Sequence, residues 1–206
     1  MKTWVISDTH LFHTKMTSLC GRPEDFTEQI ILNWNNMVGS DDVVYHLGDV
    51  GFYKKGEFGD VIKGLPGHKI LIRGNHDSFP VAWYLDNGFM SVMDFAVVIV
   101  RLQRGVTRIR NEYHRVLLSH VPMVIPAGIP NIRGRSGVYG EVEYNVHGHF
   151  HNNLAEFWEP DLLNKITEKH KLFAIEELGY KPLELGFALR HGLLVDTQSR
   201  AKGARI

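Results

Sequence analysis

The stretch Lys69-Ile70-Leu71-Ile72-Arg73-Gly74-Asn75-His76-Asp77 decides the fold class of this chain. Its first part is an apolar run typical of a buried β-strand. Gly74 then permits a sharp turn because it has no Cβ, and an amide, an imidazole and a carboxylate follow it directly. In open α/β sheets, ligands bind at the carboxyl ends of the strands. We therefore predict a functional site at the end of this strand.

The same arrangement, an apolar run followed by Asp, His or Asn, recurs along the chain. The runs at residues 4–7, 43–47, 114–119 and 142–146 lead into Asp8-Thr9-His10, Gly48-Asp49, His120 and His147-Gly148-His149-Phe150-His151. Strand ends converge along one edge of a sheet, so we expect these side chains to meet in space. His46 lies inside its strand, and we interpret it as a core residue rather than a ligand.

Composition excludes several classes of function. The chain has 206 residues, 44% hydrophobic, with 23 basic and 23 acidic side chains, so its formal net charge is zero. No bulk attraction to nucleic acid or membrane surfaces follows from that charge. The single cysteine, Cys20, excludes an internal disulfide and a cysteine-based zinc site. With no signal peptide and no apolar run near the roughly 20 residues of a membrane span, we expect a cytoplasmic protein.

The order of predicted elements indicates an α/β domain with an antiparallel second part. Strands alternate with helices at 26–37 and 81–85 and with a short helix or a polar connection at 54–64. The first helix places Phe26, Ile30, Trp34 and Met37 on one face. A hairpin follows, with strands at 95–102 and 106–110 joined by a turn at 103–105. Beyond it we expect a long loop at 122–140, a helix at 161–169, a strand at 172–178 and a helix at 183–194. We expect one domain over residues 1–206, with its motifs within 8–151 and completed by 152–206.

The side chains at the strand ends form a ligand set of carboxylate, imidazole and amide oxygen, without thiolate. Such a set suits manganese, iron, zinc or nickel. The ligands suffice for two ions, and Asp49 has two oxygens with which to bridge them. Two divalent ions with two anionic ligands leave a net positive charge, so the site would attract an anion such as a phosphate.

In this order, the residues resemble the calcineurin-like metallophosphoesterases, whose pattern is Asp-x-His, Gly-Asp, Gly-Asn-His-Asp/Glu, a lone His and Gly-His-x-His. Every element is present between residues 8 and 151. A narrower likeness, to a small bacterial or phage-type branch, rests on the histidine three residues after His10 and on Trp34-Asn35. The resemblance implies the metallophosphoesterase fold, a four-layer α/β/β/α sandwich of two mixed sheets flanked by helices.

The resemblance also implies a role for each matching residue. One metal ion would take Asp8, His10, Asp49 and His151, and the other Asp49, Asn75, His120 and His149. His76 would protonate the leaving oxygen or stabilise its charge, and Asp77 would hold His76 in orientation. The expected cofactors are two divalent ions, manganese first, with iron, nickel or zinc as alternatives. The implied reaction is hydrolysis of a phosphate ester, a small phosphodiester or nucleotide, by a metal-bridging hydroxide.

Other functions stay open at this point: a phosphomonoesterase, a catalytically silent metal-binding or scaffold protein of the same fold, and a dinuclear hydrolase of C–N or C–O bonds. Arg73, Arg133, Arg135 and His13 are candidates for substrate binding, although Arg133 and Arg135 would equally suit a solvent-facing loop. The expected partner is a small phosphorylated substrate, not a membrane or a long nucleic acid. The sequence does not give the oligomeric state.

Overall fold

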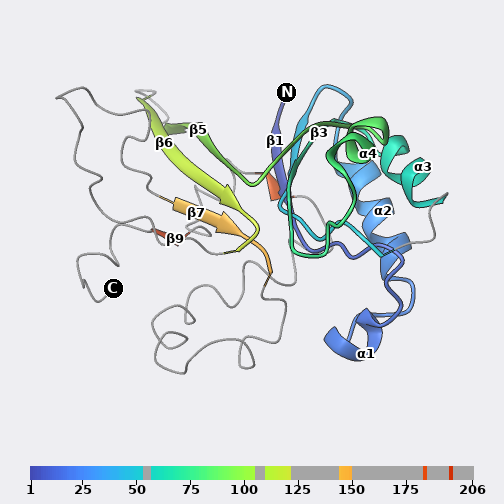
Figure 1. Ribbon diagram of the computed structural model, residues 1–206. Helices are drawn as coiled ribbons and strands as arrows, with labels where there is room; N and C mark the ends of the chain where they lie inside the picture. Colours follow the sequence, from blue (N-terminus) through green and yellow to red (C-terminus); the bar gives the residue numbers. More distant parts are fainter. Residues whose placement is uncertain (53–56, 105–109, 122–143, 150–182, 185–194, 197–206) are drawn as a thin grey trace.

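Two β-sheets lie face to face, and helices cover the outer face of the first (Figure 1). The computed structural model describes residues 1–52, 57–104, 110–121, 144–149, 183–184 and 195–196. The first sheet has the strand order β4-β3-β2-β1-β8, and the second has the order β5-β6-β7-β9. Within the described residues, no helix combines the length and apolar character that a membrane crossing requires.

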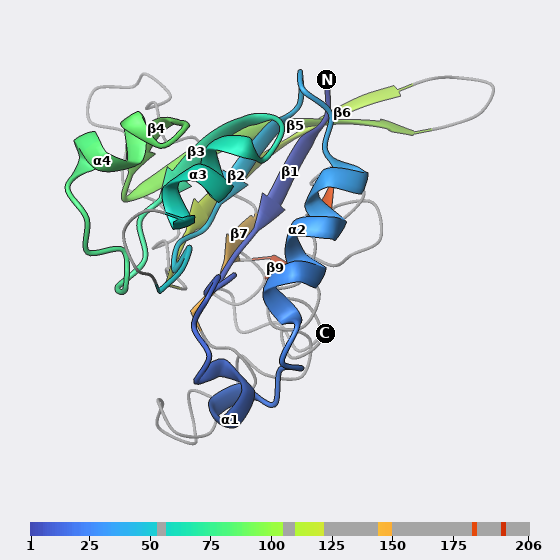
Figure 2. The same cartoon turned by 90° about the vertical axis from the view of Figure 1, so that its right-hand side faces the viewer.

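The first sheet is built from βαβ units. Its parallel strands are β1 (Thr3–Ile6), β2 (Val43–His46), β3 (His68–Ile72) and β4 (Phe89–Met93), and β8 (Leu183–Glu184) joins β1 in the antiparallel sense. The helices are α1 (Met16–Cys20), α2 (Phe26–Met37), α3 (Glu57–Gly64) and α4 (Val81–Asp86). In Figure 2, α2 and α3 lie in front of β1, β2 and β3. Parallel strands require such crossover helices on a sheet face.

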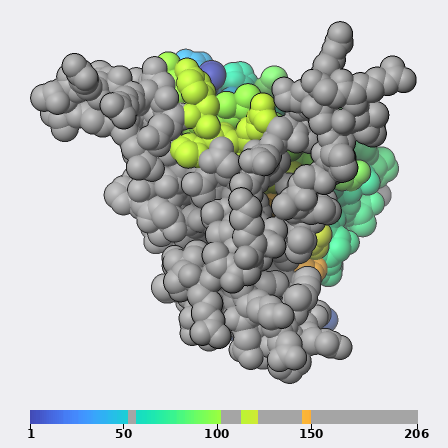
Figure 3. Space-filling view, turned by 90° about the vertical axis from the view of Figure 1, so that its left-hand side faces the viewer, coloured from blue at the N-terminus to red at the C-terminus, as the bar shows by residue number. Residues whose placement is uncertain are grey.

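The second sheet centres on a long hairpin. Strand β5 (Phe95–Arg104) pairs antiparallel with β6 (Arg110–Ser119), β6 pairs parallel with β7 (Tyr144–His147), and β7 pairs antiparallel with β9 (Val195–Asp196). In the space-filling view of Figure 3, part of β5 and β6 reaches the surface in light green. Both sheets are mixed, as the sequence predicted.

Two apolar cores hold these layers together. Along β1, Trp4 and Ile6 face the helices, where they pack with Ile30 and Trp34 of α2. Val5 points to the opposite face and joins a second core between the two sheets. Strand side chains alternate between faces, so one short strand contributes to both cores. These two cores, one against the helices and one between the sheets, fix the position of the carboxyl ends of β1, β2 and β3.

The predicted fold class is confirmed. Helix α2 has the predicted bounds, and strands β1, β2, β3 and β7 lie within a residue or two of the predicted runs. The described helices cover the first sheet. The predicted helix at 161–169, the strand at 172–178 and the loop at 122–140 lie outside the described residues.

Several predicted elements were wrong. Residues 103–104 belong to β5 rather than to a turn, and residues 114–119 are part of the same long strand that pairs with β5. Leu183–Glu184 is a strand, not the start of a helix. Met37 is 37% exposed because the chain leaves the helix there, and Val38 takes the buried position. Helix α1 and strand β4 were not predicted, since both are short and lack a clear hydrophobic period.

A buried carboxylate joins the amino ends of β1 and β2. Asp42 accepts hydrogen bonds from the Lys2 backbone N–H (2.6 Å), the Trp4 indole N–H (2.9 Å) and the Gly39 backbone N–H (3.1 Å). These hydrogen bonds, the Trp4 indole first, lower the pKa of Asp42 to about 2. The ionised form is therefore the one that stabilises this end of the sheet.

We expect Asp42→Asn to lower the free energy of unfolding by about 2 kcal/mol near neutral pH, because hydrogen bonds to a charged group are lost. A folded-state pKa below the unfolded value means that this contribution is present above about pH 4 and is lost as the pH falls toward 2. Urea unfolding from pH 7 to pH 2.5 measures the difference. The exposed neighbour Asp41 provides the control Asp41→Asn. An equal difference at both ends of the pH range would contradict this assignment.

Candidate metal centre

The predicted site residues lie at the carboxyl ends of strands from both sheets. Asp8 and His10 follow β1, Asp49 follows β2, Asn75 and His76 follow β3, His120 follows β6, and His149 follows β7. Backbone hydrogen bonds tie these loops together: Asp8 N–H donates to Gly48 O (2.9 Å), His10 N–H to Asp49 O (3.0 Å) and Gly148 N–H to His120 O (2.9 Å). The loops thus bring side chains that are far apart in the sequence to one point.

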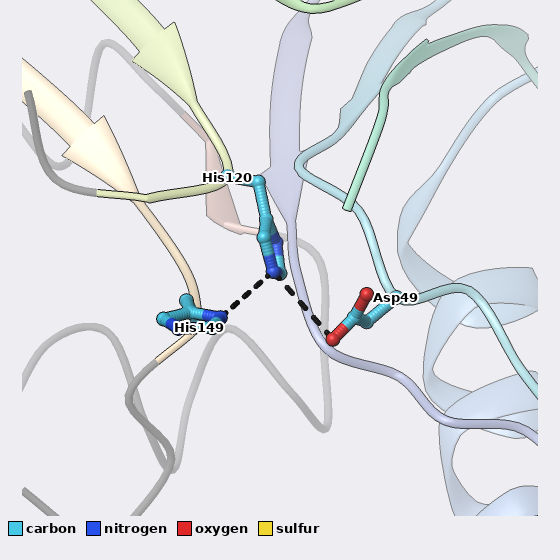
Figure 4. A group of neighbouring side chains, drawn as sticks. All are labelled: Asp49, His120 and His149. Carbon is cyan, nitrogen blue, oxygen red and sulfur yellow. Dashed lines mark hydrogen bonds and ion pairs between the residues drawn. The ribbon is translucent and has the colours of Figure 1, made fainter. Parts of the chain in front are cut away.

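Two clusters of ligand atoms share Asp49. The first contains Asp8, His10 and Asp49, and the second contains Asp49, His120 and His149, with the ligand atoms of each cluster within 4.8 Å of one another. Asp49 Oδ2 lies 3.7 Å from His10 Nε2 and 3.5 Å from His120 Nε2. Figure 4 shows Asp49 and His149 on either side of His120. Asp49 is therefore the one residue common to both clusters, as a bridging ligand would have to be; its bridging role stays a prediction.

Asn75 completes the second cluster. Its Oδ1 lies 2.8 Å from His120 Nε2 and 3.0 Å from His149 Nδ1, and these two ring nitrogens are 3.1 Å apart. An amide oxygen and two imidazole nitrogens therefore point at one small volume beside Asp49. This convergence is typical of a metal site.

Contacts behind the ligands fix their orientation. His120 Nδ1 lies 2.8 Å from Leu47 O, and a carbonyl accepts only from a protonated nitrogen, so Nε2 is left as the electron-pair donor that faces Asp49. Asp8 Oδ2 accepts hydrogen bonds from Ser7 Oγ (2.5 Å) and from the backbone N–H of His149 (2.9 Å). Metal-ligating histidines and carboxylates are commonly oriented in this way.

The backbone at the site adopts sparsely populated conformations. Asp8, His10, Asp49 and His149 have positive φ angles of 52°, 45°, 56° and 77°. Non-glycine residues in this region are strained and persist only where the surroundings hold them. Such strain clusters at functional sites, in agreement with the ligand geometry.

Two glycines allow the loops after β2 and β3 to touch. Gly48 has a φ of +96°, and a Cβ on it would collide with the backbone of Gly74. A Cβ on Gly74 would collide with the carboxylate and the backbone nitrogen of Asp49. Gly74 is therefore required for this close approach, and it also begins the predicted turn, in which the Asp77 N–H donates to the Gly74 carbonyl (3.3 Å).

The donor set fits two divalent ions. Carboxylate, imidazole and amide oxygen are ligands for metals such as manganese, iron, nickel and zinc. Burial raises the pKa of Asp49 to about 6, and bound divalent ions would favour its ionised form. Asp8, His10 and Asp49 would hold one ion, and Asp49, Asn75, His120 and His149 the other. His151, predicted as a further ligand, lies outside the described residues.

His76 lies beside the clusters without joining either. Its side chain is exposed, and its ring centroid is 5.7 Å from that of His10 and 5.6 Å from that of Phe52. Its backbone N–H donates to Asp49 Oδ1 (2.9 Å), which places the residue against the bridging carboxylate. An imidazole in this position can reach a group bound by the ions, as the predicted role requires.

Asp77 has a structural role beyond the predicted one. Its buried carboxylate accepts hydrogen bonds from the backbone N–H groups of Asp49 (2.8 Å), Val50 (3.0 Å) and Gly74 (2.8 Å), with both oxygens engaged. Among the described residues it makes no hydrogen bond to the His76 ring. Asp77 therefore holds the loop that carries Asp49, and its orientation of His76 stays a prediction.

The four substrate-binding candidates differ in outcome. His13 lies near the site, with its ring 5.7 Å from that of His10 and stacked on Phe52 at 4.2 Å. Burial, and secondarily the nearby His76, lowers the pKa of His13. Arg73 instead donates to the carbonyl of Phe79 (3.3 Å) in the loop before α4. Arg133 and Arg135 lie outside the described residues.

His46 is the core residue that the sequence predicted. It is 1% exposed, its Nε2 lies 2.9 Å from Thr9 Oγ1, and its Nδ1 accepts from Gly48 N–H (3.2 Å). Burial lowers its pKa to about 4. The neutral His46 ring thus contacts the loops after β1 and β2, through Thr9 and Gly48.

Sequence reasoning missed two residues that shape the site. The buried guanidinium of Arg22 donates to the carbonyls of Thr9 (2.8 Å) and Asp8 (2.7 Å), and so holds the loop after β1. Phe52 presents an exposed ring beside His76. Neither has a spacing signal, because arginine and phenylalanine are ordinary turn and core residues in most sequences.

We expect Asp77→Asn to weaken metal binding by about 10- to 100-fold, the usual effect of removing a group that orients a ligand. The amide would set a donor against the N–H groups that hold Asp49. Metal content after dialysis, measured by elemental analysis, tests this, with Asp86→Asn on the exposed end of α4 as the control. Retained metal with a loss of turnover alone would favour the original role, orientation of His76.

Comparisons with known proteins place this geometry in a family. A family model described as calcineurin-like phosphoesterase matches residues 1–153. The gene 66 proteins of Mycobacterium phages L5 and D29 are 28% and 30% identical over 162 residues, which cover 74% and 73% of this chain and 78% and 79% of the phage proteins. The phage relatives agree with the narrower likeness noted in the sequence.

Two further matches are a curated protein and a crystal structure. An uncharacterised protein of Methanocaldococcus jannaschii is 39% identical over 84 residues, which cover 38% of this chain and about half (48%) of that protein's length. The crystal structure of a protein of unknown function from Aquifex aeolicus superposes with a TM-score of 0.58 at 25% identity, and covers 92% of this chain and 98% of its own. The family match over three quarters of the chain carries the assignment: this protein belongs to the calcineurin-like phosphoesterase family.

Proposed function

We propose that this protein is a metal-dependent phosphodiesterase that acts on a small substrate. The observation that carries the proposal is the pair of ligand clusters joined by Asp49, with His76 beside both and bound to neither. Such a site has places for two ions, for a phosphate between them and for a proton donor. The family membership supports phosphoester hydrolysis as the general reaction class.

The charges around the site favour a diester over a monoester. A diester phosphate carries one negative charge at neutral pH, whereas a monoester approaches two and gains more from extra cationic side chains. Of the two arginines in the described site region, Arg22 donates to the carbonyls of Asp8 and Thr9, and Arg73 donates through Nη2 to the carbonyl of Phe79. A singly charged diester phosphate matches these side chains better than a doubly charged monoester phosphate does.

The chain's own residues position and protonate the reactants. When bound, two divalent ions supply Lewis acidity for the phosphate oxygens and make hydroxide available near neutral pH. Asp49 joins the two clusters. The hydrogen bond of His120 Nδ1 to the Leu47 carbonyl leaves Nε2 as the electron-pair donor that faces Asp49. His76, on the exposed side, gives a proton to the oxygen that leaves.

Metal-dependent turnover of bis(p-nitrophenyl) phosphate is the direct test of the reaction class. We expect activity with added manganese, its loss on chelation, and a kcat/KM well above that for p-nitrophenyl phosphate. Nickel, zinc and iron would be compared in the same assay. Turnover of the monoester alone would replace the proposal with a phosphomonoesterase. Inactivity on both substrates, with two ions bound per chain, would point to a metal-binding protein of the same fold.

We expect His76→Asn to reduce kcat by about 10²- to 10⁴-fold, the range typical of a general acid, while the metal content stays unchanged because His76 belongs to neither cluster. Steady-state kinetics and elemental analysis on the same preparations separate the two effects. His68→Asn is the matched control, since His68 is exposed at the opposite end of β3. Loss of metal from the His76 variant would show that this residue is a ligand instead.

A further inference from the structure

A cavity of about 490 Å³ opens beside the metal centre on the side of His76. Its lining includes Phe12, His13, Lys15, Phe52, Glu57 and Phe58. The volume falls within the range of small-molecule sites, which are mostly apolar with a few polar groups. None of the metal ligands among the described residues lines this cavity, which lies next to the ligand clusters.

Aromatic rings form the walls. His13 and Phe52 stack with their ring centroids 4.2 Å apart and an interplanar angle of 21°, and Phe12 meets Phe58 edge to face at 6.4 Å. Phe58 is buried, but Phe12 and Phe52 are 36% and 41% exposed. Large aromatic side chains left exposed beside a polar site indicate a surface that a ligand covers.

The cavity adjoins the ligand clusters because two loops are paired. Leu11 N–H donates to Val50 O (3.0 Å) and Phe52 N–H to Leu11 O (2.9 Å), which sets the loop after β1 against the loop after β2. As a result, Phe52 lies 5.6 Å from His76 and His13 lies 5.7 Å from His10, measured between ring centroids. The same backbone pairing therefore aligns the ligands and the cavity wall.

We propose that this cavity binds the nucleoside leaving group of a phosphodiester substrate. The inference rests on the proposed function, in which His76 protonates the leaving oxygen. Hydrolysis forms a P–O bond to the oxygen of water and breaks the P–O bond to the nucleoside, whose oxygen takes the proton from His76. Whatever is attached to that oxygen extends past His76, and Phe52 is the ring that it meets.

The chemistry of the walls favours a nucleobase over an alkyl chain. Bases stack on aromatic side chains regardless of their identity. Lys15 and Glu57, both exposed, add a donor and an acceptor at the rim, which suit the polar edges of a base and not a hydrocarbon. The opposite charges of these two side chains also fit a group that is itself uncharged.

The test compares two ligands that share a phosphate and differ in the nucleoside. Isothermal titration calorimetry on the manganese-loaded protein would measure Kd for adenosine 5′-monophosphate and for methyl phosphate. We expect the nucleotide to bind at least tenfold more tightly. Phe52→Leu should weaken nucleotide binding by about tenfold, the scale of one lost stacking contact, and should leave the Kd of methyl phosphate unchanged. Phe52→Tyr should restore the wild-type value.

The control is Tyr113→Leu, which removes an exposed aromatic ring from β6, away from the cavity. Equal affinity of the wild-type protein for the two ligands, or nucleotide binding that is unaffected by Phe52→Leu, would overturn the proposal. Parallel weakening of both ligands would overturn it too, because it would place Phe52 at the phosphate site. Hydrolysis of bis(p-nitrophenyl) phosphate, measured on the same samples, tells whether the diesterase proposal stands independently of the cavity.

Discussion

The site depends on the contact between the loops that follow β2 and β3. Gly48 and Gly74 meet there with no space for a side chain on either, and the carboxylate of Asp77 binds backbone N–H groups from both loops. This contact places Asp49 between the two ligand clusters. Because Asp49 belongs to both clusters, a shift of one loop would disrupt both at once. A short, rigid junction is the simplest way to hold a shared carboxylate.

The electrostatic state of the site follows from the same packing. The loops bury Asp49 and so raise its pKa, and burial also keeps the rings of His46 and His147 neutral by lowering their pKa values to about 4. A buried carboxylate is poorly stabilised without a cation, and Asp49 becomes a good ligand when one is present. The fold therefore creates the demand for metal ions at the point where the strand ends converge. Strained backbone at the ligands adds to the cost that surrounding contacts, such as those of Arg22, must offset.

Pairing of the loops after β1 and β2 connects the metal ligands to the surface beside them. Residues 8–11 and 48–52 exchange backbone hydrogen bonds almost as adjacent strands do. On these loops the ligands Asp8, His10 and Asp49 are followed by Phe12, His13 and Phe52, which line a cavity. The candidate metal centre and the cavity that we propose for the substrate therefore share these two paired loops. Under this proposal, changes in the cavity residues would alter selectivity while the ligands keep their geometry.

The sequence by itself determined the order of the strands and of α2, α3 and α4 within residues 3–86, although not α1, and it indicated the candidate ligands, because each of them follows an apolar run whose period and length mark a strand. It also identified His46 as a core residue from its place inside such a run. Only the tertiary structure decided what Asp77, Arg22 and Phe52 do. The hydrogen bonds by which Asp77 and Arg22 hold the site loops join residues that are 13 to 28 positions apart. The contact of Phe52 with His76 depends on the pairing of two loops. Local sequence patterns report on neighbours along the chain. They carry no signal for a carboxylate that binds backbone N–H groups of another loop, as Asp77 does, or for a guanidinium that binds two carbonyls, as that of Arg22 does. Nor do they indicate that the ring of Phe52 lies beside that of His76.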